Sequence, residues 1–479
     1  MTATTIELRQ PTGTAATPPP DRRRWWALAV LALAQFLVVL DASIVNIAIP
    51  SIGTDLGLSP AALTWVITAY VLPFGSLLLL GGRLADRHGH RRLFLAGIAG
   101  FTAASVIAGL APTGEVLLVA RALQGASAAL LAPASLALVT RLFTTESDRA
   151  KALGIWGAVA GIGSAAGVLL GGVLTAAFGW QAVFFVNVPV GILVLATIPV
   201  LVRADAATAR GRLDLPGAAL VTSALVALVS ALSAAEPFGF GHPLVLGLLA
   251  ASAVLFAALV VVERRSDDPL VPVALFANRG VLAGNLVMLL VGAAMVALFF
   301  ALSVYLQDAM GFDALTAGLS QLPLAGALVV AAGAVAPAIT RFGLRPVLAA
   351  SLVVVAGGLG WLAAAPVDAD FALHLLAPTV LIGLGLGGAF VSTTQLAVQG
   401  VAGGEAGAAG GLVNTSLQIG GAVGMATLPA IGAAITTALL DGGADAAAAS
   451  VTGFSAVFAG AGALALAAAA ITLLLRDRR

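Results

Sequence analysis

The chain has 479 residues, of which 60% are hydrophobic and only 9% are charged. A soluble protein of this size has no interior large enough for so much apolar surface, so the composition predicts an integral membrane protein. Cysteine is absent, which excludes disulfides, thiolate metal sites and cysteine nucleophiles. The histidines show no metal-ligand clustering beyond the loop pair His88 and His90. We therefore expect neither a metal nor another cofactor.

Residues 1–21 are rich in Thr, Pro and Ala and show no apolar period, so we expect a disordered cytoplasmic tail there. A helix needs about 20 apolar residues to cross the roughly 30 Å hydrocarbon layer of a bilayer. By that rule the sequence predicts an all-α fold with 14 membrane spans, at residues 25–48, 62–82, 93–112, 115–140, 152–175, 181–202, 214–234, 243–262, 281–304, 316–339, 346–365, 371–396, 408–437 and 452–475.

The basic residues test this division, because loops on the cytoplasmic side of a membrane carry an excess of Lys and Arg. Of the 23 Lys and Arg residues, 22 lie in the two tails or in loops that follow even-numbered spans. Loops after odd-numbered spans carry acidic residues instead, such as Asp55 and Asp441. The pattern predicts that both termini are cytoplasmic. The remaining base, Arg121, lies inside span four.

Two stretches about 250 residues apart are similar to each other. Span two and its exit contain Leu72-Pro73 and Arg87-His88-Gly89-His90-Arg91, and span ten and its exit contain Leu322-Pro323 and Arg341-Phe342-Gly343-Leu344-Arg345. Spans nine to fourteen therefore read as a repeat of spans one to six. We expect one six-helix half at 22–202, a two-helix insert at 203–265 and a second half at 266–479. Transporters built from such repeats bind substrate at the midplane between the halves.

One carboxylate, Asp41, lies in the first span, within the stretch Leu40–Pro50. A charge at the bilayer centre costs roughly 2.5–3.5 kcal/mol on insertion scales, so an ionisable residue in a span usually has a function. Arg121 is the other ionisable residue well inside a predicted span, and no second deeply buried carboxylate is evident. With the predicted boundaries, Asp41 lies about 10 Å and Arg121 about 9 Å inside the outer ends of their helices.

Opposite charge at matching depth predicts that Asp41 and Arg121 form a pair or a proton relay, so we assign proton coupling to both residues. Two simpler interpretations stay open. In the first, Asp41 lies near the end of its span and only hydrogen-bonds a neighbouring helix. In the second, Arg121 extends its guanidinium to the outer surface of the membrane.

The loop after span two reads Gly82-Arg83-Leu84-Ala85-Asp86-Arg87-His88-Gly89-His90-Arg91-Arg92. It resembles the loop 2–3 signature of the major facilitator superfamily, although His90 stands where a fixed positive charge is usual. Glycine permits a tight turn in such a loop, and an aspartate can pair with an arginine or cap a facing helix. The alternative is an ordinary basic loop. The resemblance implies a cytoplasmic gate formed by Gly82, Arg83, Asp86, Arg87, Gly89 and Arg91.

Span five resembles the glycine motif that the same family shows in its exporters, except that Val168 replaces a usual proline. Three of its glycines are four residues apart and share one helix face, along which another helix can pack closely or slide. General small-residue packing is the competing interpretation. The glycines of the motif are Gly154, Gly163, Gly167, Gly171 and Gly172.

Four other stretches resemble motifs of this family. Leu118–Gly125 resembles the span-four motif whose arginine is linked to proton coupling in antiporters, which implies that role for Arg121. Leu40–Pro50, Gly179–Gly191 and Tyr305–Gln307 resemble the fourteen-span drug–proton antiporter branch. Several polar residues in or beside the spans are expected to line a substrate cavity, although hydrogen bonding between helices explains each of them equally well. These are Asn46, Gln124, Tyr305, Gln307, Asn414 and Gln418.

The sequence as a whole predicts a proton-driven antiporter that exports hydrophobic, often cationic, amphipathic small molecules across the cytoplasmic membrane of a bacterium by alternating access. The expected mechanism is competition between a proton and a cationic drug for Asp41. The nearest alternative is a dedicated exporter of one antibiotic or metabolite on the same fold. A nutrient symporter and a membrane enzyme or receptor are less well supported, since the span-five motif is typical of exporters and no catalytic set of residues occurs. We expect protons, a small molecule and lipid as partners, no nucleic acid, and a monomer.

Overall fold

The computed structural model describes residues 22–143, 145–203, 214–266, 269, 273–399, 401 and 406–474. The expected tail at 1–21 lies outside these residues. Within them every regular element is helical. The helices of the first half are α1 (Arg22–Leu56), α2 (Pro60–His88), α3 (His90–Gly109), α4 (Gly114–Leu142), α5 (Glu146–Phe178), α6 (Ala182–Phe185) and α7 (Asn187–Leu201).

Two helices follow, α8 (Leu215–Phe238) and α9 (Pro243–Arg265). The remaining elements are η1 (Val273–Ala277), α10 (Arg279–Val304), η2 (Tyr305–Ala309), α11 (Ala314–Phe342), α12 (Leu344–Ala363), η3 (Phe371–Leu375), α13 (Leu376–Val398), α14 (Ala406–Asp441) and α15 (Ala446–Leu474).

Thirteen helices of the described part of the chain are long and apolar enough to cross a membrane. The helix α5 runs over 33 residues and takes the place of the remaining predicted span, although the side chains of much of its first half are outside the described part. Predicted span six is divided into α6 and α7. Pro189 has no N–H to donate to the carbonyl of Phe185, so the helix is interrupted between these residues and α7 begins at Asn187.

Side-chain caps and glycine turns set several helix ends. Ser59 and Asp313 accept hydrogen bonds from backbone N–H groups at the starts of α2 and α11. These two helices end alike, at Gly89 and Gly343, whose φ angles of 93° and 88° are rarely adopted by other residues. The equivalent turns occur at the equivalent places of the two similar stretches, which is what an internal repeat requires.

The first helix is longer than predicted. Span one was expected to end at residue 48, yet α1 continues through Pro50 to Leu56. Proline removes one backbone hydrogen bond, so the carbonyl of Asn46 has no partner within the helix. That carbonyl accepts a hydrogen bond from Ser303 Oγ of α10 at 2.7 Å. The helix therefore survives its proline because another helix satisfies the exposed carbonyl.

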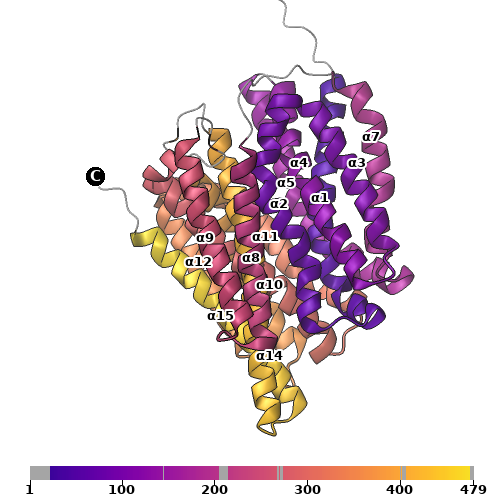
Figure 1. The fold of residues 1–479 in the computed structure, drawn as a ribbon, viewed down its shortest axis with the longest axis vertical. Coiled ribbons are helices and arrows are strands. Elements are labelled where there is room, and N and C mark those ends of the chain that lie inside the picture. The colour runs from indigo at the N-terminus through magenta and orange to yellow at the C-terminus, as the bar shows by residue number, and fades with distance from the viewer. Residues whose placement is uncertain are drawn as a thin grey trace, which may run out of the picture.

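The helices form two groups, indigo to magenta on one side and orange to yellow on the other (Figure 1). The largest apolar clusters follow this division, one mainly within α1–α8 and the other within α10–α15. Helix α8 packs against α2 and α14, one helix from each group, and α9 packs against α8. The two-helix insert thus covers the line along which α2 and α14 meet.

Several of the contacts that join the two groups lie toward the end of the bundle at which α1 and α5 finish. There Ser303 bonds the Asn46 carbonyl, and Gln307 Nε2 donates to the carbonyl of Ile47 at 3.2 Å. Beside them, a Cβ placed on Gly172 of α5 would lie 2.6 Å from the Ala314 carbonyl oxygen of α11. We call the hydrogen bonds of Ser303 and Gln307 to α1 the α1–α10 latch.

Candidate functional site

Asp41 and Arg121 form a buried ion pair. Asp41 lies within α1 and Arg121 within the second turn of α4, and Arg121 Nη1 is 2.5 Å from Asp41 Oδ2. Their exposed fractions are 0% and 1%. Arg121 therefore does not extend to the membrane surface, which rules out that interpretation of the sequence. Because α1 runs on to Leu56, Asp41 is also nearer the middle of its helix than predicted.

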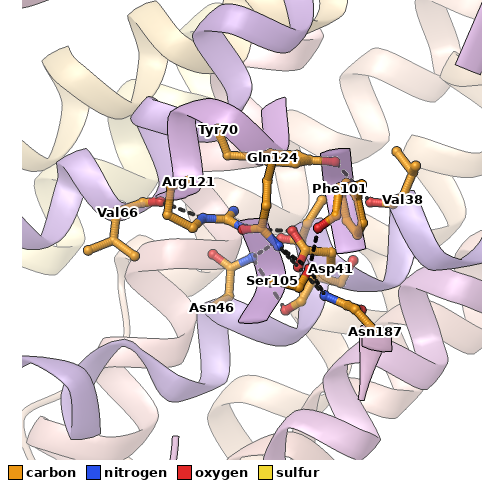
Figure 2. A network of polar contacts seen from close by, with 12 residues as sticks. Val38, Asp41, Asn46, Val66, Tyr70, Phe101, Ser105, Arg121, Gln124 and Asn187 are labelled. Atoms are coloured by element: carbon orange, nitrogen blue, oxygen red, sulfur yellow. Dashed lines mark hydrogen bonds and ion pairs between the residues drawn. The ribbon is translucent and has the colours of Figure 1, made fainter. Parts of the chain in front are cut away.

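Three uncharged residues complete a polar network around this pair, shown converging on Asp41 in Figure 2. Gln124, one turn along α4 from Arg121, donates to Asp41 Oδ1 at 3.1 Å. Asn187, the first residue of α7, donates to the same oxygen at 2.8 Å. Ser105 of α3 accepts from both amides, at 2.8 Å from Gln124 and 3.3 Å from Asn187. Four helices, α1, α3, α4 and α7, thus meet at one carboxylate.

The guanidinium of Arg121 is fixed on all sides. Its Nε donates to the carbonyl of Val66 on α2, and its Nη1 donates to Gln124 Oε1 as well as to Asp41. The ring of Tyr70 lies 4.4 Å from its central carbon, close enough for a cation–π interaction. A planar group with several directed N–H donors can serve all these partners at once, whereas a lysine ammonium cannot.

This arrangement suits an ionised aspartate. Asp41 accepts hydrogen bonds from Arg121, Gln124 and Asn187, and a carboxylate with a counter-ion and several donors can stay charged away from water. No surface of Asp41 is left for a substrate in this state, since its exposed fraction is 0%. Direct competition between a drug and a proton for Asp41, as expected from the sequence, does not fit this geometry.

The glycines of span five lie against α1 on both sides of Asp41. A Cβ on Gly163 would lie 3.2 Å from the Phe36 carbonyl oxygen, one on Gly167 2.7 Å from Ser43 Cβ, and one on Gly171 2.8 Å from the Ile44 carbonyl oxygen. Gly172 faces α11 instead, and the surroundings of Gly154 fall outside the described residues. Three glycines therefore let α5 approach the helix that carries the carboxylate.

The predicted gate loop is a turn between α2 and α3, centred on Gly89. Arg83 Nη2 donates to the carbonyl of Pro269 at 2.6 Å, which connects the end of α2 to the segment between α9 and η1. Asp86 Oδ1 lies 3.0 Å from Nε2 of the buried His90, so the unusual histidine of this signature has a partner within the loop.

Other gate residues occupy different surroundings. Arg91 donates to the Pro199 carbonyl at 3.3 Å, and Arg87 is exposed. Gly82 lies within α2 and not in a turn, and a Cβ there would only touch Pro133 at 3.8 Å. Its neighbour Gly81 is the tightly packed glycine, because a Cβ there would lie 2.1 Å from the Ala129 carbonyl oxygen. The turn-forming role expected for glycine belongs to Gly89 alone in this loop.

The expected cavity residues divide into two groups. Gln124 is part of the Asp41 network, and Tyr305 is 2% exposed and packs its ring against Phe454 and Phe458, so neither offers surface to a substrate in this state. Asn46 is also buried, beside the α1–α10 latch. The others keep some exposed surface: Gln307 at the latch, Gln418 against Gly75, and Asn414.

Three buried residues were not found from the sequence. Asn187 lies in the Gly179–Gly191 stretch and is the one amide within the apolar run 182–202, which is a usable signal. Ser105 gives no signal, because serine is common in membrane helices. Glu263, 4% exposed at the end of α9, is a second deeply buried carboxylate that the sequence did not reveal. It belongs to the insert and not to the Asp41 network.

Comparison with known proteins places the chain in a family. A family model described as Major Facilitator Superfamily matches residues 31–425. The puromycin resistance protein pur8 of Streptomyces alboniger is 44% identical, over 90% of this chain and 86% of that protein. The cephamycin export protein CmcT of Amycolatopsis lactamdurans is 43% identical, over 84% of each chain.

A solved structure of similar fold is that of a bacterial homologue of the human lysosomal transporter Spinster, in an inward-facing and unoccupied conformation. It matches with a TM-score of 0.68 and 15% sequence identity over 96% of this chain and 98% of that one. This likeness agrees with the all-helical architecture described above. The chain belongs to the major facilitator superfamily and is a multi-pass protein of the cell membrane.

Proposed function

We propose that this protein is a proton-coupled antiporter that exports small amphipathic, antibiotic-like molecules. The observation that carries the proposal is the Asp41–Arg121 pair, sealed among four helices of the first half. Asp41 is the fully buried carboxylate among the described residues of the two six-helix halves. The relatives of this chain include a puromycin resistance protein and a cephamycin export protein. They favour antibiotics as the substrate class.

In the proposed mechanism the proton acts through helix packing. Ionised Asp41 holds α1 against α4 and α7 through its three donors, Arg121, Gln124 and Asn187. A proton on Asp41 cancels the charge that Arg121 balances, so it weakens this attachment and lowers the free-energy cost of moving α1. Substrate binds elsewhere, between the halves. Substrate binding is coupled to proton binding because the substrate favours one position of α1 and the proton favours another.

The described state fits one stage of that cycle. In the orientation predicted from the basic loops, the α1–α10 latch closes the external side of the bundle. An ionised Asp41 belongs to the stage of the cycle in which the substrate site is open to the cytoplasm. External protons then reach Asp41 only after the latch opens. Arg121 remains charged throughout, because a guanidinium does not lose its proton at physiological pH.

An efflux screen tests this function. The protein is expressed in a pump-deficient bacterial host, and accumulation of chemically diverse dyes and antibiotics is measured with and without a proton uncoupler. We expect reduced accumulation of at least one amphipathic antibiotic, and restoration of accumulation by the uncoupler. Export of several unrelated compounds would identify a multidrug exporter, and export of one compound a dedicated exporter. Efflux that persists with the gradient collapsed would contradict proton coupling.

A further inference from the structure

The amide of Asn187 is placed on Asp41 by local features of α7. Pro189 starts the helix so that Asn187 is its first residue. One turn on, Gly191 lets α7 lie directly on α3, since a Cβ there would meet Thr102 Oγ1 at 1.9 Å. The same approach brings Asn187 to Ser105 of α3 and to Asp41 of α1. A buried amide, 0% exposed, is thus held beside the carboxylate by helix geometry.

The hydrogen bonds of the network fix which way this amide faces. Its Nδ2 group lies near two acceptors, Asp41 Oδ1 and Ser105 Oγ. With the amide reversed, its oxygen would face a carboxylate oxygen, so the donor orientation is the one assigned for an ionised Asp41. The other end of the amide, Asn187 Oδ1, is buried and has no hydrogen-bond partner among the described residues.

A protonated Asp41 needs an acceptor that an ionised one does not. If the proton binds Oδ1, the new O–H must find an oxygen, because a buried donor without a partner is costly. Gln124 Oε1 already accepts from Arg121, and Ser105 Oγ already accepts from two amides. Asn187 Oδ1 is the acceptor of this network that is not in use.

We propose that Asn187 is a positioning residue that holds Asp41 in both protonation states by turning its amide over. When Asp41 is ionised, Asn187 Nδ2 donates to it. When a proton joins Asp41 Oδ1, the amide rotates by half a turn: Asn187 Oδ1 accepts the new O–H, and Asn187 Nδ2 gives up its hydrogen bonds to Asp41 Oδ1 and Ser105 Oγ. No covalent bond breaks other than the one that delivers the proton. Arg121 keeps its hydrogen bonds to Val66 and Gln124. The inference rests on the proposed function of Asp41.

The surroundings of Asp41 leave this role to Asn187. The titratable groups that face the carboxylate are Arg121 of α4 and Tyr70 of α2, and the tyrosine hydroxyl donates to the Val38 carbonyl at 3.2 Å. Helix α3 presents Ser105, and the described part of α5 presents glycines. From the second half, Ser303 of α10 and Gln307 of η2 reach α1, and neither side chain titrates. Helix α11 meets the first half mainly through α5.

Infrared difference spectroscopy of the purified, membrane-reconstituted protein tests the inference. A step to acidic pH should produce a carboxylic-acid band from Asp41, identified by its loss in Asp41→Asn, together with a change in a side-chain amide band. In Asn187→Leu, which keeps the size of the side chain but has no polar atom, the amide change should disappear and the carboxylic-acid band should move to higher frequency. Asn285→Leu is the matched control: Asn285 is also a buried amide, bonded to Ser416 in the second half, and its loss should leave both signals in place.

Transport by two variants separates positioning from packing. The hydroxyl of Asn187→Ser can both donate and accept, although it is smaller, so we expect proton–substrate exchange at least tenfold faster than in Asn187→Leu. If Asn187 only filled space, the leucine variant would be the faster one. An Asp41 band that is the same in wild type and Asn187→Leu would overturn the inference and leave proton binding by Asp41 intact. A carboxylic-acid band that persists in Asp41→Asn would instead contradict the proposed function itself.

Discussion

At the scale of single residues, the site shows how a membrane helix retains a charge. Moving a carboxylate and a guanidinium out of water is costly, and their attraction offsets the cost only when hydrogen bonds satisfy the remaining polar atoms. Asp41 meets that condition with Gln124 and Asn187, and Arg121 meets it with the Val66 carbonyl and the ring of Tyr70. The network therefore makes the pair tolerable and also holds it in one geometry.

Removing one partner should expose this balance. We expect Arg121→Ala to lower the melting temperature of the detergent-purified protein, because breaking a buried pair costs about 3–5 kcal/mol. The loss should be smaller at acidic pH, where Asp41 takes up a proton and no longer needs a counter-charge.

The double variant Asp41→Asn/Arg121→Ala supplies the control. Since it leaves no unpaired carboxylate, it should melt at a higher temperature than Arg121→Ala alone and without the pH dependence. Equal melting temperatures for wild type and Arg121→Ala at neutral pH would show that the pair does not contribute to stability.

From the sequence, the charged residues of this site could be located, but its uncharged residues could not be recognised as their partners. Asp41 and Arg121 stand out because charges are rare in apolar spans, and their rarity is itself a signal. Gln124, Ser105 and Asn187 are polar residues of kinds that many membrane helices use for packing, so nothing marks them as partners of Asp41. Their role depends on the crossing of four helices, which is a property of the tertiary structure.

At the scale of elements, α1 is the helix on which the two halves and the charge network act together. The glycines of α5 pack against it around Asp41, and the α1–α10 latch bonds it nine and ten residues before its end at Leu56. Sequence analysis placed the end of this helix at residue 48, before Pro50, a residue that usually interrupts helices. It could not anticipate that Ser303, more than 250 positions away, supplies the missing hydrogen bond.

Weakening the latch should favour the state open to the outside. The chain has no cysteine, so a single cysteine at Asn46, which is only 9% exposed beside the latch, is a clean reporter. In cells carrying Asn46→Cys, we expect a membrane-impermeant maleimide to label the residue several-fold faster when Ser303→Ala and Gln307→Ala are added. Each substitution removes a hydrogen bond to α1, worth about 0.5–1.5 kcal/mol. Identical labelling rates with and without the two alanines would mean that the latch does not hold the halves together.

At the scale of the whole molecule, sequence predicted much of the architecture because lipid imposes simple rules. Long apolar segments in lipid must be helices. Because basic loops stay on the cytoplasmic side, their positions in the sequence show in which direction each helix crosses the membrane. The all-helical fold and membrane location follow from these rules and are confirmed by the described helices and the relatives. The position of α8 against α2 and α14 was not predictable, because an insert can pack anywhere along the bundle.

The orientation of the bundle is open to a direct test with the same cysteine-free background. A cysteine at Gly442, in the turn between α14 and α15, should react with an impermeant maleimide added to intact cells. A cysteine at Arg87, an exposed residue in the last turn of α2, should react only after the cells are permeabilised. Labelling of both positions from the same side would be incompatible with the predicted topology, because these turns lie at opposite ends of an alternating bundle.

The central claim is that Asp41 binds the transported proton, and proton movement driven by substrate tests it most directly. Purified protein is reconstituted into liposomes with an internal pH dye, and an exported antibiotic found in the efflux screen is applied as a gradient. Wild-type protein should move protons against the antibiotic. Asp41→Asn keeps the size of the side chain and should lower the rate of that proton movement tenfold or more. The melting temperature of this variant shows that it is folded. Antibiotic-driven proton movement at the wild-type rate in Asp41→Asn would contradict the account.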